Sequence, residues 1–364
     1  MKILYGVQGT GNGHISRARM LARHFQYTDI DVTWLFSGRP RDNYFDMECF
    51  GDCLYRRGLT FHSEDGRVSY TKTAINNDPW AFISDVFSLD TTNYDCIVTD
   101  FEPITAWAGK RQGRKVIGLG HQYAFGHPIP RAGGNIIANS IIKLFAPATI
   151  PLGLHWHHFG SAILPPIIDP DATSQSPGRG LLAQGDKIVV YLPFENQAKV
   201  RQLLSPIEQY HFVIYSPELT DQAHEHISLR KTCLKGFKRD LATARGVICN
   251  SGFELISECL ALGLPVLTKP QYGQMEQLSN AEALRTLGLA STLTELSTAA
   301  IECWLSNRPA TKKIMQYPDV AKRIVEWLAS GQRESAQALS QQLWRQVRLP
   351  RTHPHCRHPF RWHN

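Results

Sequence analysis

A glycine-rich turn that ends in a histidine lies near the N-terminus. Gly9, Gly11 and Gly13 alternate in the segment GTGNGHIS, and His14 follows them directly. Glycines permit a tight turn and the close approach of a ligand or another backbone. A histidine at the start of a helix exchanges a proton near neutral pH, so His14 is a candidate general base for an attacking hydroxyl group. The alternative is a histidine that only caps the loop.

Acidic and imidazole groups follow two later strand candidates. Asp100 ends the apolar run CIVTD, Glu102 comes shortly after it, and His121 lies in the segment GLGHQ. Ligands bind beyond the carboxyl ends of parallel strands, so we expect Asp100 to orient His14 or to bind acceptor hydroxyls, with Glu102 as the second choice. His121 should project toward the same cleft. Such groups also serve as ordinary hydrogen-bonding partners within loops.

A second group of polar residues lies between Asn250 and Ala281. The segment NSGFELISECL follows a short apolar run, and Ser251 is predicted to be the N-cap of a helix. Gly252 allows close approach where the free amides of that helix can bind a diphosphate. Glu258 lies in the second helical turn, where its carboxylate can accept hydrogen bonds from both ribose hydroxyls. A solvated helix carboxylate is the alternative for Glu258.

The loop after the next strand offers partners for sugar hydroxyls. It reads QYGQMEQLSNA and carries amide and carboxylate groups suited to paired hydrogen bonds. These groups belong to Gln274, Glu276, Gln277 and, one turn later, Asn280. Because Gln and Glu are mostly surface residues, the loop alone says little. Its order after the helix that carries Gly252 and Glu258 makes the pattern specific.

Together the two segments resemble the signatures of GT-B glycosyltransferases. The resemblance is to the group that contains the peptidoglycan N-acetylglucosaminyltransferase and the UDP-glucuronosyl and plant glucosyltransferases, and most of all to a poorly characterised prokaryotic branch. The segment from Asn250 to Ala281 matches the donor-binding signature, and His14 matches the final histidine of the glycine loop. The resemblance covers both halves of the chain. It implies an α/β GT-B fold, in which two doubly wound, Rossmann-like domains face each other across a cleft.

The resemblance also assigns donor-binding roles by position. Backbone amides would contact the diphosphate, a carboxylate the ribose, two side chains the donor sugar, and the end of an LKGF strand the nucleotide base. In that order the residues are Gly252 and Phe253, Glu258, Glu276 with Gln277, and Gly236 with Phe237. The usual Asp-Gln pair after the loop glycine here reads Gly273-Gln274-Met275-Glu276-Gln277. Which side chain holds which hydroxyl therefore stays open.

The implied reaction is an inverting transfer from a nucleotide-sugar donor, expected to be a UDP-sugar, to an acceptor hydroxyl of a glycan or lipid-linked glycan. His14 would act with Asp100, and the acceptor side would comprise Gly11, Gly13, Glu102 and His121. Helix amides can stabilise the departing diphosphate without a metal, so no cofactor and no essential metal is expected. A nucleotide-sugar epimerase or a glycosyl phosphorylase on the same fold is one alternative. A non-catalytic nucleotide-sugar-binding protein is another.

The elements that must position these residues form a repeating pattern. Short apolar runs alternate with longer amphipathic stretches, which is typical of βαβ units. Strands are predicted at 2–7, 32–36, 96–99, 116–119, 187–191, 211–215, 234–237, 247–249 and 266–268. Helices are predicted to start near His14, Pro79, Pro103 and Asn135, and to cover 320–328 and 334–347. The second of the last two is expected to pack back across the domain junction.

Length and composition fit two soluble domains. With 364 residues, the chain is too long for one ordinary core. We expect an acceptor-side domain at 1–165, a linker rich in Pro, Ser and Gly at 166–186, and a donor domain at 187–330. A helix at 331–347 and a flexible basic tail at 348–364 complete the chain. The eight scattered cysteines form no CxxC pair and favour a reducing, cytoplasmic environment.

The distribution of charged and apolar residues indicates which partners, nucleic acid or membrane, the chain can have. The formal net charge is +7, but the last twenty residues contain five arginines and no acidic residue, which leaves +2 for the rest. A nucleic-acid partner is not expected, because it would require a basic face on the folded body. The tail can contact anionic membrane. The apolar segment from Asn135 to Phe145 fits either a membrane contact or a buried helix, so association with the inner face of the membrane stays open.

Overall fold

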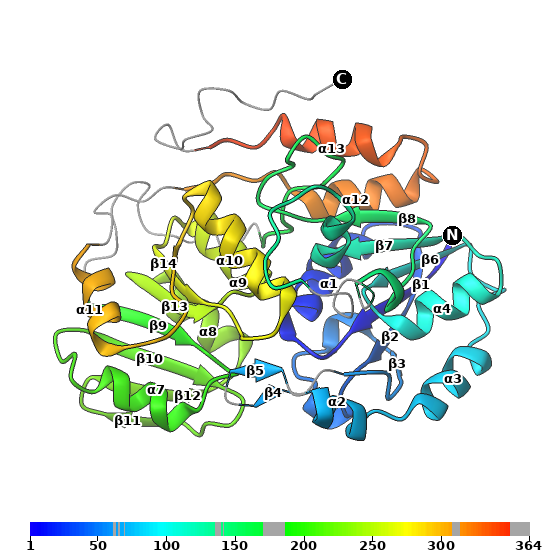
Figure 1. Cartoon of the computed structure of the whole chain (residues 1–364). Helices are drawn as coiled ribbons and strands as arrows, with labels where there is room; N and C mark the ends of the chain where they lie inside the picture. The colour runs from blue at the N-terminus through cyan, green and yellow to red at the C-terminus, as the bar shows by residue number, and fades with distance from the viewer. Residues whose placement is uncertain are drawn as a thin grey trace.

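The computed structural model contains two parallel β-sheets, one in each half of the chain (Figure 1). It describes residues 1–349 except 61–62, 65, 69, 135–139, 141, 170–185 and 308–313. The strand orders are β3-β2-β1-β6-β7-β8 and β11-β12-β10-β9-β13-β14-β15. Within these sheets only the β11–β12 pair is antiparallel. Such sheets bind ligands beyond the carboxyl ends of their strands.

The first sheet is built from buried apolar runs. Its strands are β1 (Lys2–Gln8), β2 (Asp31–Ser37), β3 (Leu54–Tyr55), β6 (Cys96–Asp100), β7 (Val116–Gly120) and β8 (Ile150–Gly153). Its helices are α1 (Asn12–Phe25), α2 (Tyr70–Asn76), α3 (Pro79–Ser88) and α4 (Pro103–Arg111), and β4 (Ser63–Glu64) with β5 (Arg67–Val68) forms a separate hairpin. Proline occupies the first turn of α3 and α4, where a missing N–H costs nothing. Val7 pairs with Asp100 in register, which brings the turn before α1 beside the end of β6.

The second sheet repeats this plan. Its strands are β9 (Lys187–Tyr191), β10 (His211–Ser216), β11 (Gln222–His224), β12 (Ile227–Lys231), β13 (Gly246–Asn250), β14 (Val266–Lys269) and β15 (Ser291–Thr292). Its helices are α7 (Gln197–Leu204), α8 (Leu234–Ala242), α9 (Phe253–Leu262), α10 (Met275–Leu287) and α11 (Thr298–Ser306). Asn250 at the end of β13 pairs with Lys269 at the end of β14. The loops that precede α9 and α10 therefore lie at the same edge of the sheet.

One predicted strand is wrong. The segment 234–237 is not a strand but the start of α8, and the strand of this unit is β12, a few residues earlier. Leu234, Phe237 and Leu241 recur at the spacing of three to four residues that is typical of a helix. The short run LKGF cannot reveal this period unless it is read together with the residues that follow it.

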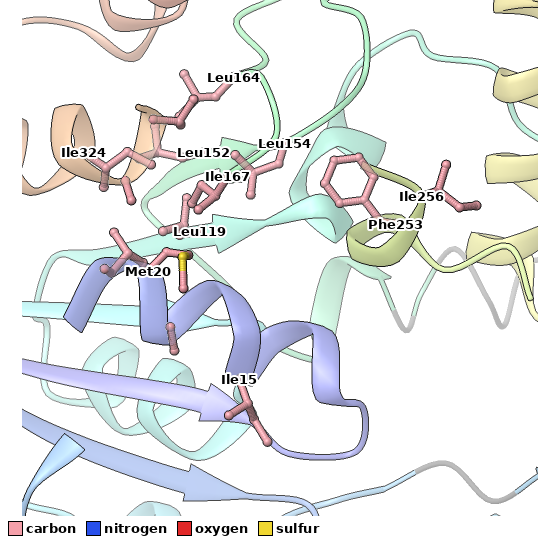
Figure 2. Close-up of a cluster of buried hydrophobic side chains, with 14 of the residues drawn as sticks. Ile15, Met20, Leu119, Leu152, Leu154, Leu164, Ile167, Phe253, Ile256 and Ile324 are labelled. Carbon is pink, nitrogen blue, oxygen red and sulfur yellow. The ribbon is translucent and has the colours of Figure 1, made fainter. Parts of the chain in front are cut away.

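The C-terminal helices return to the first sheet. α12 (Val320–Ala329) packs against α1, and α13 (Ala336–Trp344) follows it. The Ser340 hydroxyl and the Trp344 indole both donate to the carbonyl oxygen of Ile163, each at 2.6 Å. In Figure 2, Ile324 of α12 lies beside Leu152 of the first sheet. The end of the chain thus completes the core of the first half.

Apolar packing also joins the two halves. Figure 2 shows Phe253 and Ile256 of α9 across from Leu154, which follows β8. The indole of Trp156 donates to the hydroxyl of Ser257 at 2.8 Å, and both side chains are buried. Because burial on this scale is strongly stabilising, the packing fixes the start of α9 close to the first half.

Several predictions fall partly or wholly outside the described residues. The helix start at Asn135 and most of the segment to residue 139 belong to this group. So do 170–185 of the linker, which include Asp171, and 350–364 of the basic tail. The proposed membrane contacts of these segments stay predictions.

Candidate active site

His14 lies in the first turn of α1 and contacts the end of β6. Its Nδ1 atom is 2.6 Å from Oδ1 of Asp100, which is fully buried. Burial acts to raise the pKa of Asp100, but Arg17 and His14 hold that pKa below its ordinary value. An ionised carboxylate only accepts hydrogen bonds, so Nδ1 of His14 carries the proton. The Nε2 atom then keeps its lone pair and can accept a proton.

Arg17 connects this pair to the second half of the chain. It lies one turn after His14 and is itself buried. Its Nε atom donates to Oδ2 of Asp100 at 2.7 Å, and its Nη2 atom donates to Oδ1. Its Nη1 atom donates to the carboxylate of Glu254 in the first turn of α9. One guanidinium therefore links the candidate base to the second half of the site.

Glu102 has a capping role. Its carboxylate accepts hydrogen bonds from the amides of Ile104 and Thr105 at 2.9 and 2.7 Å, and from the hydroxyl of Ser37 at 2.6 Å. The Glu102 side chain thereby fixes the start of α4 to the end of β2. Between Asp100 and Glu102, Phe101 adopts a φ of 52°, which is unusual for a residue other than glycine. The structure does not bring Glu102 to His14.

His121 joins the two halves. Its Nδ1 atom is 2.8 Å from the carbonyl oxygen of Leu154, and its Nε2 atom is 2.6 Å from Oδ1 of Asn280. Its ring stacks on Phe253 with a centroid distance of 4.2 Å. Asn280 is completed by a 2.9 Å hydrogen bond from Nδ2 to the carbonyl oxygen of Ser251. His121 and Asn280 are therefore occupied by interdomain contacts.

The prediction that Ser251 caps α9 is wrong. Gly252 is the N-cap, and because glycine has no side chain α9 has no side-chain cap. The Ser251 hydroxyl lies instead 2.9 Å from that of Thr268, because the serine sits at the end of β13 beside β14. The Gly252 amide donates to the carbonyl oxygen of Asn250 at 2.8 Å. The next amides of the first turn, from Phe253 onward, can serve an anion.

Glu258 lines a cavity of about 280 Å³ between α1, α8 and α9. It lies one turn after Glu254, and Leu234, Lys238 and Asp169 line the same cavity. Burial raises the pKa of Glu258 to about 7; Lys238 opposes this shift, whereas Asp169 and Glu254 add to it. A carboxyl group that ionises near neutral pH and faces a cavity is a strong ligand-binding candidate.

The residues of the predicted sugar-binding loop make three kinds of contact, and Glu276 and Gln277 lie in the first turn of α10. Gln277 accepts a hydrogen bond from the Gln271 amide at 2.9 Å and so stabilises the loop itself. Glu276 accepts one from Nε2 of Gln122 at 3.0 Å, across the interface. The Oε1 atoms of Gln274 and Gln122 are buried without a hydrogen-bond partner in the part of the chain that the structure describes. These two oxygens are candidates for ligand contact.

The remaining predicted residues border the same region. Gly236 and Phe237 lie in α8. The centre of the Phe237 ring is 5.5 Å from that of Tyr191 and 5.1 Å from that of Tyr215. Gly11 is the N-cap of α1. A Cβ atom on Gly13 would lie 2.6 Å from Oε2 of Glu254, so a larger residue at this position would displace the Glu254 carboxylate.

Three site residues escaped the sequence analysis, namely Arg17, Glu254 and Gln122. Arg17 follows His14 by one helical turn, and Gln122 directly follows His121. These two positions could therefore have been predicted from the histidines beside them. The signal for Glu254 was weaker, because nothing in the sequence pairs α9 with α1.

A metal-binding cluster and a membrane-spanning helix are both absent from the residues that the structure describes. No group of three or more His, Cys, Asp or Glu side chains there could hold a metal ion. Asp169 forms ion pairs with Arg23 and Lys238. No helix in the described ranges is long and apolar enough to cross a membrane.

The chain matches one protein family over most of its length. The family model described as glycosyl transferase family 1 matches residues 1–309. The chain belongs to this glycosyltransferase family. It is therefore a glycosyltransferase, as the glycine loop and the segment from Asn250 to Ala281 predict. No curated protein matches the chain.

Solved structures confirm the predicted GT-B fold. The glycotransferase of kitacinnamycin superposes with a TM-score of 0.57 and 13% identity, covering 95% of this chain and 99% of its own. The glycosyltransferase SsfS6 of Streptomyces sp. SF2575, complexed with thymidine diphosphate, has a TM-score of 0.54 and 11% identity, with 94% and 96% covered. MurG of Acinetobacter baumannii has a TM-score of 0.52 and 12% identity, with 94% and 99% covered. At these identities the likeness establishes the fold.

Proposed function

We propose that this glycosyltransferase moves a sugar from a nucleotide-sugar donor to an acceptor hydroxyl, with inversion at the anomeric carbon. The observation that carries the proposal is the His14–Asp100 pair, which Arg17 links to the uncapped start of α9. A base and an anion-binding helix end thus lie on opposite sides of one interface. A similar fold that holds thymidine diphosphate supports a nucleotide donor.

In this mechanism His14 Nε2 removes the proton from the acceptor hydroxyl. The acceptor oxygen attacks the anomeric carbon, while the bond from that carbon to the diphosphate oxygen breaks. The nucleoside diphosphate leaves with the electron pair, and the attack from the opposite face inverts the anomeric centre. Asp100 holds the histidine ring and stabilises the imidazolium that forms, since its carboxylate is ionised and buried.

Charge on the leaving diphosphate would be balanced by the protein. The amides at the start of α9 point along the helix dipole toward an anion. Arg17 reaches the same helix end, where its Nη1 atom donates to the Glu254 carboxylate, and we propose that the diphosphate takes the place of this carboxylate. We therefore propose a transfer that needs no divalent metal, in which fixed dipoles and one cation act together.

The donor would lie along α9 toward α8. Glu258 would accept hydrogen bonds from the ribose diol, and Leu234 and Lys238 border the same cavity. Gln274 and Glu276 would hold the sugar hydroxyls, with Gln122 from the first half. We propose a UDP-sugar as donor and a glycan or lipid-linked glycan as acceptor. The likeness to MurG, which is a fold likeness, is compatible with such an acceptor.

A ligand screen followed by a variant tests this function. UDP-, GDP- and dTDP-sugars are compared by thermal shift, since a ligand at 100 times its Kd adds about 2.7 kcal/mol of apparent stability. The stabilising donor is then used to compare the natural enzyme with His14→Ala. We expect the variant to bind the donor and to lose transfer. Unchanged transfer by the variant, or the absence of any stabilising nucleotide sugar, would contradict the proposal.

A further inference from the structure

Helix α3 presents an apolar face to solvent. Trp80, Ile83 and Phe87 are 79%, 44% and 64% exposed. Their spacing of three and four residues puts them on one side of the helix. Val86, at the side of this face, is buried in the core of the first half. Three large apolar side chains at such exposure on one short helix are unusual, and contiguous patches of this kind mark interaction surfaces.

The neighbouring elements extend this face. α3 packs beside α4, and Trp107 of α4 donates its indole N–H to the carbonyl oxygen of Leu144 at 3.0 Å. The side chain of Leu144 is itself 58% exposed. Figure 1 shows α3 and α4 on the flank of the first sheet that is turned away from the second sheet. We call the surface formed by Trp80, Ile83, Phe87, Trp107 and Leu144 the α3 face.

Cations surround the α3 face. The guanidinium of Arg111 lies 4.7 Å from the centre of the Phe87 ring and donates to the Phe87 carbonyl oxygen at 3.2 Å. The Lys110 ammonium lies 4.8 Å from the Trp107 ring. Lys143, next to Leu144, is exposed. These long side chains cover apolar surface with their stems and keep their charges in water.

The acidic groups of this helix are neutralised locally. Asp78, the N-cap of α3, lies 3.6 Å from Arg57, and Asp85 lies 3.4 Å from Arg56. Lys110, Arg111 and Lys143 outnumber Asp90, an exposed acid just beyond α3 whose carboxylate accepts hydrogen bonds from Thr92. A partner for this face must therefore be apolar at its centre and negatively charged around it.

We propose that the α3 face docks on an anionic lipid surface. A helix with tryptophan and phenylalanine on one side and cations beside it lies in the membrane interface, where the apolar side chains insert below the headgroups. Tryptophan favours this depth because its ring is amphipathic. Lys110, Arg111 and Lys143 would meet anionic headgroups, whose attraction for basic side chains acts over about a Debye length.

The proposed docking would orient the active site. α4 starts directly after the turn that carries Asp100 and Glu102, so the α3 face belongs to the same half as the candidate base. An acceptor held at the membrane would reach the enzyme from this half. The inference goes beyond the transfer reaction and does not rest on it, because membrane binding is measured without any sugar donor.

Vesicle co-sedimentation of the full chain tests the proposal. The protein is mixed with vesicles of phosphatidylcholine alone and of phosphatidylcholine with phosphatidylglycerol. We expect binding to the anionic vesicles that weakens as salt is raised. The triple variant Trp80→Ser, Ile83→Ser, Phe87→Ser should bind these anionic vesicles at least about tenfold more weakly than the natural chain. The double variant Lys110→Glu, Arg111→Glu should lose the preference for anionic lipid.

Matched controls make the outcome decisive. Tyr27→Ser removes another large side chain, 82% exposed, that lies at the end of α1 and outside the α3 face, so its vesicle binding should not change. Thermal melts check that each variant folds. Equal vesicle binding by the triple variant and the natural chain would overturn the proposal. The proposal would also be overturned if the natural chain does not bind vesicles but forms a dimer, and the triple variant is monomeric.

Discussion

The Arg17 guanidinium on α1 donates to the Glu254 carboxylate in the first turn of α9. The same guanidinium holds both oxygens of Asp100, which in turn holds His14. The carboxylate thus occupies the end of a helix where an anion is favoured by the amide dipoles. A donor diphosphate that approaches this end would compete with Glu254 for Arg17.

Removing the charge of Glu254 should therefore tighten donor binding. In Glu254→Gln the carboxylate no longer repels the diphosphate, and Arg17 is freed to meet it. We expect the donor Kd to fall by roughly threefold to tenfold, which corresponds to the usual value of a partly exposed charge contact. Isothermal titration calorimetry with the donor found by the ligand screen measures this change.

The matched control for this variant is Glu282→Gln. Glu282 pairs with Arg285 on the exposed side of α10, so its loss should leave the donor Kd unchanged. A weaker donor affinity in Glu254→Gln would show that Glu254 contacts the donor itself and that the competition does not exist.

Asp100→Asn should lower the melting temperature more than His14→Ala does. Asp100→Asn leaves the buried Arg17 without its main counter-ion, and breaking a buried ion pair costs about 3 to 5 kcal/mol. We expect a clear fall in melting temperature together with a fall in kcat of about a hundredfold or more. His14→Ala should lose transfer with little change in melting temperature, because its side chain is partly exposed. Equal destabilisation by both variants would contradict this division of roles.

The central strands of both sheets could be predicted because each is a short, buried apolar run, whereas β3, β8, β11, β12 and β15 were not predicted. The strand at 187–191 has the predicted bounds, and most others differ by a residue or two. The run at 234–237 failed because four residues are too few to separate a strand from a helical turn. The strand β12, which lies between β11 and β10, was missed because its sequence, ISLRK, mixes apolar and polar residues.

The individual contacts of the site were harder to predict, since they depend on the second half meeting the first. Glu102 looks in sequence like a cleft carboxylate, but it caps α4, a local role that the proline after it indicates. His121 and Asn280 look like ligand-binding groups, but each completes the other across the interface. Local pattern gives the strand end on which a residue lies. It does not show which side chain, more than a hundred residues away in the sequence, will form a hydrogen bond with that residue.

Chelation of divalent metals should leave the enzyme active. The proposed stabilisation of the leaving group relies on Arg17 and the amides of α9, none of which needs a metal. The initial rate of transfer is therefore expected to be the same before and after dialysis against EDTA. A loss of rate that added Mg²⁺ or Mn²⁺ restores would contradict the metal-independent mechanism.

Acid should destabilise the fold through its buried histidines. Burial, together with His121 and His157, holds the pKa of His155 well below its ordinary value, and burial lowers the pKa of His158 to about 4. Both histidines are neutral in the fold, whereas the unfolded chain takes up protons below about pH 6.5. Stability should therefore fall as the pH drops from about 6.5 toward 4. Melting curves of the natural chain and His158→Gln measure this, and the variant should show a flatter pH dependence. Equal slopes would rule out a contribution from His158.

Glu258 should make donor binding depend on pH. Its folded pKa of about 7 lies above the ordinary value, so the carboxyl group is protonated at pH 6 and ionised at pH 8. The ligand-free fold loses the corresponding stability as the pH rises from about 4.5 through 7. The ionised form accepts both ribose hydrogen bonds, so donor affinity should rise by about tenfold between pH 6 and 8. In Glu258→Gln the affinity should be lower at pH 8 and almost independent of pH. Titrations at three pH values decide the point, because a variant that keeps the full pH dependence would place the titrating group elsewhere.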